Sequence, residues 1–491
     1  MKTAIGIGIG MVAAISALVA PGDHAEMTYQ SYTGVASAAV RPGDGDPARA
    51  RALLEAARGA PPAMCGLAER ALEQSGWGGR GVPATASPVS AWALESRPAG
   101  AAVAVLLEGL ASGDACMSSL SARLLARSRD AAALRGLAAA LEATAPATRA
   151  AAAVGLGLSE AEQALQHLLA ALRDDVPAVR AAVAWGLGEL EDPRAIEALV
   201  RLLRDDPDES VRAEAARALG EIESRRAIPA LGEALREDRS TRVRATAAWA
   251  LGQIEEEEAV PVLARGLEDG EESVREQSAW ALGEIEAASA VEPLARVLER
   301  DRSARVRATA VWALGEIESG TAVDALSRVL RDDGSAELRR SAAWSLGEIE
   351  AASAVEPLAA ALRDDDAEVR RMSAWAIGSI EPRQAPRALL AALEDPNPRV
   401  QEMAIWAVGQ TEDRAAVAAL TPLLRSDDAQ LRRAALWALA RMDAPEAHEG
   451  LRALLEDADP EVRRGAARAL VGHGVDPWPM PMPRPMPRPT P

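Results

Sequence analysis

One tryptophan recurs at a nearly constant spacing through much of the 491-residue chain. Neighbouring members lie 31 or 32 residues apart, except across one 64-residue gap whose midpoint is Arg217. The set consists of Trp185, Trp249, Trp280, Trp312, Trp344, Trp375, Trp406 and Trp437. A fixed period of this length predicts an all-α solenoid of two-helix repeats, in which each repeat packs only on its two neighbours.

The repeat over residues 224–255 shows the expected anatomy. A first helix covers about residues 225–236, with apolar side chains at helical spacing at Ile228, Leu231 and Leu235. An acidic turn then leads to a second helix over residues 241–254. One face of this second helix carries Val243, Ala247, Ala250, Leu251 and Ile254. We expect this face to form the core and Trp249 to lie on the outer face.

The periodic pattern divides the chain into segments. Residues 159–475 form the regular repeat array, and residues 47–158 contain degenerate copies. We interpret these copies as capping repeats, because the ends of a solenoid must cover its core. Their helical pattern begins at Asp46 and Pro47, a pair typical of a helix start. Residues 26–46 are an aperiodic linker, and residues 476–491 form a tail in which proline alternates with other residues.

Residues 1–25 have the features of an export signal. Lys2 precedes an apolar run over residues 5–20, which is shorter than the roughly 20 apolar residues of a membrane-spanning helix. Cleavage after Ala25 is unfavourable, because Asp23 stands where a small neutral residue is expected. Two interpretations therefore stay open: a cleaved signal peptide of a periplasmic or secreted protein, or an uncleaved membrane anchor.

Charge and cysteine content constrain the partners and the compartment. The net charge is −19, and a surface this acidic repels phosphate backbones, so we expect no nucleic-acid binding. It favours basic partners instead. Cys65 and Cys116 fall in the capping repeats, where a disulfide bond would fit an oxidising compartment. We prefer two buried thiols, because free cysteine commonly packs as a small apolar side chain.

The units resemble HEAT-like repeats of the phycobilisome-lyase type. The matching motif is Val-Arg-x-x-Ala-Ala-x-Ala-Leu-Gly-x-Ile followed by Ala-Val-x-Pro-Leu. It stands at residues 243–254, and again at 274–285 with 290–294. The resemblance covers about two thirds of the chain and implies a right-handed α-solenoid whose second helices line the concave surface. It implies no single function, because such repeats serve lyase subunits, adaptors and scaffolds alike.

The resemblance also implies a structural charge ladder, in which an acidic turn residue pairs with the arginine that opens the following helix. The corresponding pairs are Asp206/Arg212, Asp238/Arg244, Asp269/Arg275, Asp301/Arg307, Asp333/Arg339, Asp364/Arg370 and Asp457/Arg463, with a break at Gln401 opposite Asp395. A recurrent glycine near the end of the second helix, such as Gly283, predicts a close approach of the neighbouring helix.

Catalysis has few candidate residues. The four histidines are scattered, and His448-Glu449 lacks the second histidine of a zinc-protease motif. The sequence contains no nucleophile elbow and no phosphate-binding loop. The acidic pairs in the turns do not converge as calcium ligands must. We expect a non-enzymatic protein without a cofactor or a metal site.

The tryptophan series admits two interpretations. Because exposed aromatic rows mark interaction surfaces, the rings would line a groove whose small neighbouring residues leave them accessible. Alternatively, each ring packs on the next repeat. We favour binding, and we add to the site the glutamates one helical turn past a tryptophan, Glu284, Glu316 and Glu348. Such a groove suits an extended segment that contains proline, apolar residues and arginine.

The tail has a composition of this kind, with Arg484 and Arg488 among its prolines. Polyproline II is the only regular conformation open to it. The tail is therefore a candidate ligand of the groove, in the same or another copy, although a low-complexity end without a role is the interpretation we prefer at this stage.

The sequence as a whole predicts a non-catalytic scaffold that binds a protein or peptide on a concave, tryptophan-lined surface. One alternative is a lyase-like or chaperone subunit that acts on a bound cofactor or protein. The other is a purely structural spacer.

Overall fold

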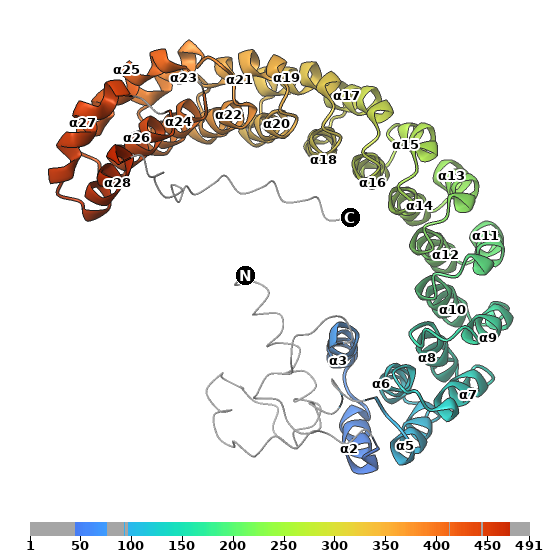
Figure 1. The fold of residues 1–491 in the computed structure, drawn as a ribbon. Coiled ribbons are helices and arrows are strands. Elements are labelled where there is room, and N and C mark those ends of the chain that lie inside the picture. The colour runs from blue at the N-terminus through green and yellow to red at the C-terminus, as the bar shows by residue number, and fades with distance from the viewer. Residues whose placement is uncertain (1–44, 76–92, 94–96, 412, 443–444, 472–491) are drawn as a thin grey trace. The chain divides into compact units, whose positions relative to one another are not determined.

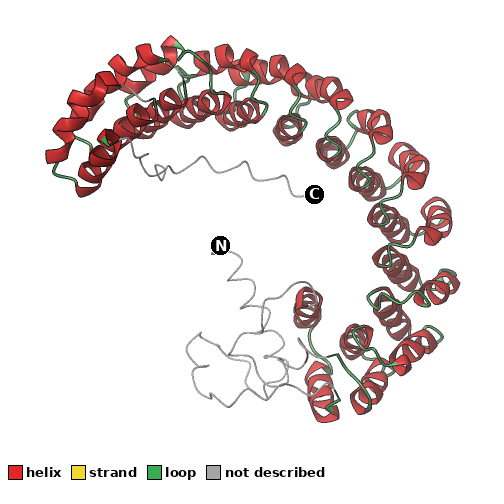
Figure 2. Cartoon of the chain, viewed as in Figure 1, coloured by secondary structure: helices red, strands yellow, loops and turns green. Residues whose placement is uncertain are grey.

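The computed structural model describes residues 45–75, 93, 97–411, 413–442 and 445–471. The export segment, most of the linker, residues 76–92 and the proline-rich tail lie outside the described residues, so the expectations about them stay predictions. Every regular element within the described ranges is a helix (Figure 2). None of these helices is both long and apolar enough to cross a membrane.

The chain forms two compact units, Met1–Ala250 and Leu251–Pro491. The first unit contains α2 (Pro47–Ala57), α3 (Pro62–Ser75), α5 (Ala101–Leu110), α6 (Ala115–Ala126), α7 (Ala131–Ala140), α8 (Pro146–Gly157), α9 (Ala164–Ala171), α10 (Pro177–Glu189), α11 (Ile196–Asp205), α12 (Glu209–Glu221) and α13 (Ile228–Glu237). Helix α14 (Thr241–Gln253) contains the boundary. The second unit contains α15 (Val260–Gly266), α16 (Glu272–Glu284), α17 (Val291–Arg300), α18 (Ala304–Glu316), α19 (Val323–Asp332), α20 (Ala336–Glu348), α21 (Val355–Ala361), α22 (Ala367–Ile380), α23 (Arg387–Ala391), α24 (Pro398–Gln410), α25 (Val417–Leu420), α26 (Ala429–Arg441), α27 (His448–Ala453) and α28 (Pro460–Leu470).

From α5 onward, the helices of each unit alternate between two rows (Figure 1). We call the odd-numbered helices A helices and the even-numbered ones B helices. Within a unit, an internal B helix packs on its own A helix and on the B helices before and after it, as α18 does on α17, α16 and α20. A B helix therefore has three covered sides, and only a narrow strip of it can face solvent.

Local sequence signals place the helix starts where they were predicted. The Asp46 side chain accepts hydrogen bonds from the backbone N–H groups of Ala48 and Arg49 and so caps α2, which begins at Pro47. Pro229 and Pro261 stand at the second position of α13 and α15, where the missing N–H leaves no hydrogen bond unmade.

The predicted core is confirmed. The apolar faces of the A and B helices are buried in the repeat over residues 224–255, and the same pattern recurs along both units. The buried residues of that repeat include Ile228, Leu231, Leu235, Val243, Ala247, Ala250, Leu251 and Ile254.

The recurrent glycines mark the closest approach of successive B helices, as predicted. A Cβ atom added to Gly283 would lie 2.9 Å from the Ala313 Cβ, and one added to Gly347 would lie 3.0 Å from the Ala376 Cβ. Side-chain carbons do not pack this closely. Only glycine therefore allows the helix axes to reach this separation.

The charge ladder is present, but its ion pairs join neighbouring repeats and do not close within one repeat. The pairs are Arg149–Asp174, Arg180–Asp206 and Arg212–Asp238 in the first unit, and Arg275–Asp301, Arg307–Asp333, Arg339–Asp364, Arg370–Asp395 and Arg432–Asp457 in the second. The expected carboxylate pairing within a repeat is wrong, because the arginine reaches only the backbone carbonyl of its own turn. Arg339, for example, donates from Nη1 to the carbonyl oxygen of Asp333 over 2.9 Å.

Each arginine thus ties its own turn to the next one. Arg339 donates from Nε and Nη2 to the two carboxylate oxygens of Asp364, over 2.7 and 2.8 Å. The same hydrogen bonds are the main reason why the pKa of Asp364 is lowered. A carboxyl with a lowered folded-state pKa stabilises the fold above the ordinary aspartate pKa of about 3.9, and this stabilisation is lost as the pH falls through the folded-state value.

The ladder is interrupted between α24 and the turn before α26, and both partners have changed there. Gln401 stands in the arginine position and Ser426 in the aspartate position of the following repeat. The Ser426 hydroxyl still accepts a hydrogen bond from the Asp428 N–H, which is the turn-capping role that Asp364 plays for Asp366. Asp395 pairs normally with Arg370, so the break lies one repeat later than the sequence indicated.

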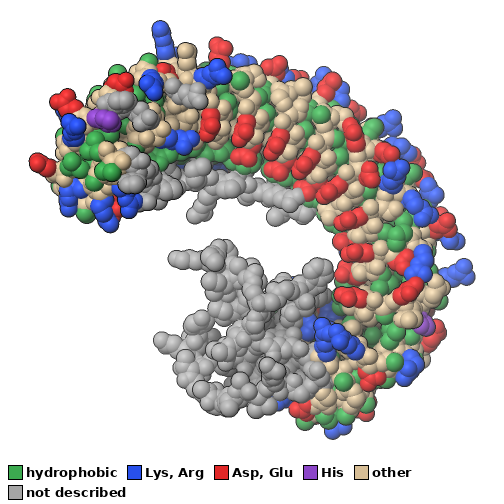
Figure 3. All heavy atoms as spheres, in the orientation of Figure 1, with side chains coloured by type: hydrophobic (Ala, Val, Ile, Leu, Met, Phe, Trp, Pro, Cys, Tyr) green, Lys and Arg blue, Asp and Glu red, His purple; other side chains and the backbone are tan. Residues whose placement is uncertain are grey.

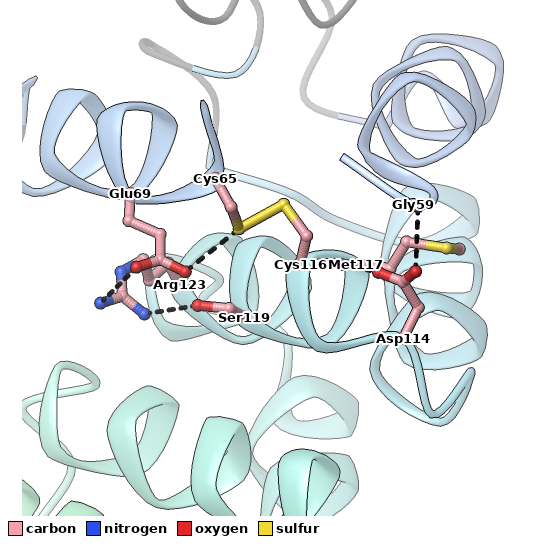
Figure 4. Close-up of a disulfide and its surroundings, with 8 residues drawn as sticks. All are labelled: Gly59, Cys65, Glu69, Asp114, Cys116, Met117, Ser119 and Arg123. Carbon is pink, nitrogen blue, oxygen red and sulfur yellow. Dashed lines mark hydrogen bonds and ion pairs between the residues drawn. A yellow bond between two sulfur atoms is a disulfide. The ribbon is translucent and has the colours of Figure 1, made fainter. Parts of the chain in front are cut away.

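A disulfide bond links the two cysteines, which corrects the preference for free thiols. Cys65 on α3 and Cys116 on α6 have Cα atoms 5.7 Å apart, within the range that a disulfide spans (Figure 4). The packing of α3 on α6 brings them together, a contact that spacing in the sequence does not encode. Nearby, the Asp114 carboxylate accepts from the backbone N–H groups of Met117 and Gly59, which fastens the loop after α2 to the start of α6.

We predict that the double substitution Gln401→Arg/Ser426→Asp stabilises the array, because it completes the ladder. Either substitution alone leaves a charge without its partner and gains nothing. The two changes should therefore couple favourably, by about 1–3 kcal/mol in a double-mutant cycle of thermal or urea unfolding. Strictly additive effects would contradict the cross-repeat pairing.

Candidate binding surface

The tryptophan series lies between successive B helices. The exposed fraction of the side chain is 4% for Trp280, 6% for Trp312, 8% for Trp344 and 7% for Trp375. The other four, Trp185, Trp249, Trp406 and Trp437, are half-buried. The expectation that small neighbours leave the ring faces accessible is therefore wrong for the four buried members.

The rings cover the glycines of the preceding repeat. A Cβ atom added to Gly283 would lie 2.7 Å from Cζ3 of Trp312, and one added to Gly347 would lie 2.7 Å from Cζ3 of Trp375. Trp280, Trp406 and Trp437 meet Gly252, Gly378 and Gly409 in the same way. The indole thus fills the crease that the close approach of the two helices leaves beside it.

A helical wheel could not show this packing, because it assigns one buried face to a helix. The B helix buries three sides, and the tryptophan lies on the side that meets the preceding B helix. Where arginine replaces tryptophan in the frame, it leans the same way. The Arg217 guanidinium lies 5.9 Å from the ring centre of Trp185, a cation–π contact across one repeat.

The B helices end in a recurrent Glu-Ile-Glu or similar triplet, and its second glutamate has an unusual backbone. Glu286, Glu318 and Glu350 have φ values of 52°, 48° and 51°. Their N–H groups bond the carbonyl of the glycine three residues earlier, so they form the left-handed C-terminal turn in which glycine is the usual residue. The same conformation recurs at Glu160, Glu191, Glu223, Glu255 and Glu381.

In the second unit, these glutamates and the last residues of the B helices form one acidic strip. We call it the glutamate row, and it consists of Glu284, Glu286, Glu316, Glu318, Glu348 and Glu350. Figure 3 shows acidic side chains gathered along the B-helix edge of this unit. Glu286, Glu318 and Glu350 are exposed, and the other three are half-buried.

Neighbouring carboxylates of the row act on Glu348. Burial first, and then the neighbouring carboxylates of Glu318, Glu316 and Glu350, raise the pKa of Glu348. All the influences resolved on this group disfavour its charge. A raised carboxyl pKa means that ionising Glu348 near neutral pH costs the folded protein free energy, and acidification through its folded-state pKa relieves that cost.

Three local penalties therefore coincide in the row. A left-handed backbone costs a residue other than glycine about 1 kcal/mol or more. A negative charge at the C-terminal end of a helix opposes the helix dipole. The neighbouring like charges repel the charge of Glu348. None of these terms stabilises the fold.

Some of the equivalent glutamates in other repeats have cationic or amide partners. In the first unit, Arg217 lies 3.0 Å from Glu221 and 3.9 Å from Glu189. At the other end of the second unit, Glu381 accepts from Gln410 and lies 3.8 Å from Arg441. The sequence positions equivalent to Glu348 there are Ser379, Gln410 and Arg441, so the row loses its acidity toward α28.

The sequence prediction named half of the glutamate row. Glu284, Glu316 and Glu348 do lie along one edge, but Glu286, Glu318 and Glu350 were missed. The available signal was their recurrence two residues later, directly after the helix ends. In the described part of the chain, no group of three or more histidine, cysteine or acidic residues could hold a metal ion.

Comparison with known proteins settles the family. The family model for HEAT repeats matches overlapping stretches that together run from residue 134 to residue 476. The chain is a HEAT-repeat protein. No curated protein matches it closely enough to count as a relative.

Solved structures similar to this HEAT-repeat protein differ widely in kind. An engineered protein is 24% identical, with a TM-score of 0.34, and the match covers 69% of this chain and 98% of that one. Human deoxyhypusine hydroxylase in complex with glycerol is 25% identical, with a TM-score of 0.24 and coverage of 50% and 96%. Kap95p, whose structure concerns RanGDP, is 16% identical, with a TM-score of 0.48 and coverage of 83% and 62%. Superpositions this loose say nothing about function.

We predict that Trp375→Ala lowers stability by about 3–5 kcal/mol, because it empties a buried crease between two B helices. Trp437→Ala should cost less, since that ring is half-buried near the end of the described array. Urea unfolding followed by circular dichroism, with hydrogen exchange of α20 and α22, measures both. Unchanged stability of the Trp375→Ala protein would show that the ring is not part of the repeat interface.

Proposed function

We propose that this HEAT-repeat protein is a non-catalytic scaffold that binds a basic, extended protein segment along the glutamate row. The observation that carries the proposal is the cluster of Glu316, Glu318, Glu348 and Glu350. Its members disfavour the charge of Glu348, and two of them, Glu318 and Glu350, have a left-handed backbone. A cationic ligand removes the repulsion, so binding recovers free energy that the unbound protein has lost.

The spacing of the row favours an extended arginine-containing segment over a compact ligand. Successive B helices lie about 8–10 Å apart, so the carboxylates come in pairs at that interval. Arginine reaches carboxylates with a planar fork of donors and forms two parallel hydrogen bonds. An extended peptide can offer one such side chain every three or four residues. The half-buried Trp406 and Trp437 add ring edges on which an arginine or a proline can rest.

The other candidate functions have less support. The motif resemblance to phycobilisome-lyase repeats stays an inference about the subtype, and a lyase-like or chaperone role acting on a bound cofactor has no residue of this structure that favours it. A spacer without a ligand accounts for the tryptophans, since they pack between repeats. It does not account for the glutamate row, whose cost a spacer would have no reason to keep.

We also propose that the protein is exported. The apolar segment behind Lys2 motivated this expectation, and the disulfide between Cys65 and Cys116 supports it, because disulfides persist in oxidising compartments. The bond holds α3 to α6 at the start of the array. A staple at this position limits fraying of the first capping helices.

In the native host, we expect a chain that lacks residues 1–25 or is held at the membrane by them, and that has no free thiol. Alkylation of the purified protein without reduction should leave Cys65 and Cys116 unmodified, and intact mass reports both features. A cytoplasmic protein that starts at Met1 and takes up two alkyl groups would contradict export.

For the binding function, we predict that Glu318→Gly/Glu350→Gly stabilises the protein and weakens its binding at the same time. Glycine relieves the left-handed backbone strain, with a gain of about 1 kcal/mol at each site. The loss of two ion pairs should weaken binding of a synthetic peptide of alternating proline and arginine roughly threefold to thirtyfold. Calorimetry and thermal unfolding measure the two effects separately.

The matched control removes the same charge from exposed positions on A helices. Glu292→Gln/Glu356→Gln changes the net charge by as much but leaves the row intact. Equal losses in both variants would mean that the peptide responds only to net charge. No binding by any variant, or unchanged binding after the glycine substitutions, would leave the spacer as the better description.

A further inference from the structure

We propose that the tail of the same chain occupies the glutamate row, with Arg484 at the carboxylates of Glu348 and Glu350 and Arg488 at those of Glu316 and Glu318. This inference rests on the proposed function and names the ligand that the row meets first. A basic segment of another protein would then have to displace the tail.

The tail follows α28, the last B helix of the described array. Helix α28 ends at Leu470. In the sequence of the repeats, Gly472 is the position that corresponds to Glu348, four repeats of 31 residues later. Between them lie the frame positions 379, 410 and 441 at the ends of successive B helices. These helices pack one on the next from α20 to α28 within the second unit. The end of α28, at Leu470, therefore lies four repeats from the end of α20, on the same end of the B helices.

The distances match in the same register for both arginines. Four steps of about 8–10 Å separate α28 from α20, or about 32–40 Å, and five steps to α18 make about 40–50 Å. Residues that precede proline are biased toward extended backbone, and polyproline II advances about 3.1 Å per residue. Arg484 is 12 residues past Gly472, or about 37 Å, and Arg488 is 16 residues past it, or about 50 Å.

The charges match in the same register. Asp476 lies four residues past Gly472, about one repeat step along, where the B helix ends in Arg441. Residues 477–483 carry no charge, and they would cross the repeats whose frame positions are Gln410 and Ser379. The first arginine of the tail then arrives where the carboxylates begin. In this register, Asp476 faces an arginine position, residues 477–483 face uncharged positions, and Arg484 faces carboxylates.

Occupation within the same chain is favoured by the stiffness of the segment. A chain that is already extended loses little conformational entropy when it binds a groove. Attachment at α28 gives the tail an effective concentration on the order of millimolar at the row. Against an intrinsic Kd of about 0.1 mM, this would lower the affinity for a free competing peptide about tenfold.

The near absence of lysine makes a direct test possible. Lys2 is the only lysine of the chain, so Arg488→Lys or Arg484→Lys adds an amine with almost no background. A zero-length carbodiimide reagent joins amines to adjacent carboxylates, and mass spectrometry identifies the product. We expect cross-links from position 488 to Glu316 or Glu318, and from position 484 to Glu348 or Glu350.

Isotope labelling decides between one chain and two. In a mixture of ¹⁵N-labelled and unlabelled full-length protein, cross-linked peptides should be uniformly labelled or unlabelled. Mixed pairs would show that the tail serves a second copy, and this would overturn the proposal. Cross-links to A-helix acids such as Glu292 and Glu356, or no cross-link within the second unit, would overturn it as well.

Competition separates this inference from the proposed function. The full-length Arg484→Glu/Arg488→Glu variant should bind the proline–arginine peptide about tenfold more tightly than the unsubstituted protein, because its row is vacated. Equal affinity of the two proteins, with the loss still seen in the Glu318→Gly/Glu350→Gly protein, would refute the tail as occupant but leave the binding function standing. If substitution of the row changes nothing, the binding function itself fails.

Discussion

Close approach of successive B helices is the constraint on which the rest of the structure depends. The contact leaves no room for a side chain at Gly283 or Gly347, and the indole of the following repeat closes the crease beside it. Glycine costs a helix about 1 kcal/mol relative to alanine, so its recurrence means that the packing gained at short distance exceeds that cost. A fixed helix separation also fixes the interval at which every other feature of the repeat recurs, including the ladder and the glutamate row.

The close approach fixes the distance between successive B helices. The charge ladder restricts the rotation of one turn relative to the next. An arginine such as Arg339 bonds the backbone of its own turn and the carboxylate of the following turn, so it acts as a strap between repeats. At Gln401 and Ser426 the strap is missing on both sides, and the serine keeps only the turn-capping role. Replacement of both partners avoids an unpaired charge in a partly buried site, which costs several kcal/mol when only one partner is removed.

Features that depend on period and on local caps could be predicted from the sequence, and contacts across repeats could not. The period, the two helices, the core face at Val243 and Leu251, and the close approach at Gly283 all follow from spacing along one chain segment. The burial of Trp312 and the partner of Arg339 depend on what the neighbouring repeat presents. The strained backbone at Glu318 was hidden for another reason, because glycine, and not glutamate, is the usual signal of that turn.

The glutamate row combines a left-handed backbone with neighbouring like charges, and both lower the stability of the fold. Equivalent glutamates at the two sides of the row have partners, Arg217 for Glu221 and Arg441 for Glu381, so the repeat can accommodate its acidic ends when a cation is supplied. In α16, α18 and α20, a tryptophan stands at the repeat position that Arg217 holds in α12. Its ring fills the crease between two B helices. The residue that seals the repeats therefore does not supply the positive charge that Arg217 supplies in its own repeat. In the proposed function, neighbouring positions at one helix end serve packing and binding. An arginine of an extended ligand would pair with the glutamates there as Arg217 pairs with Glu221 within the chain.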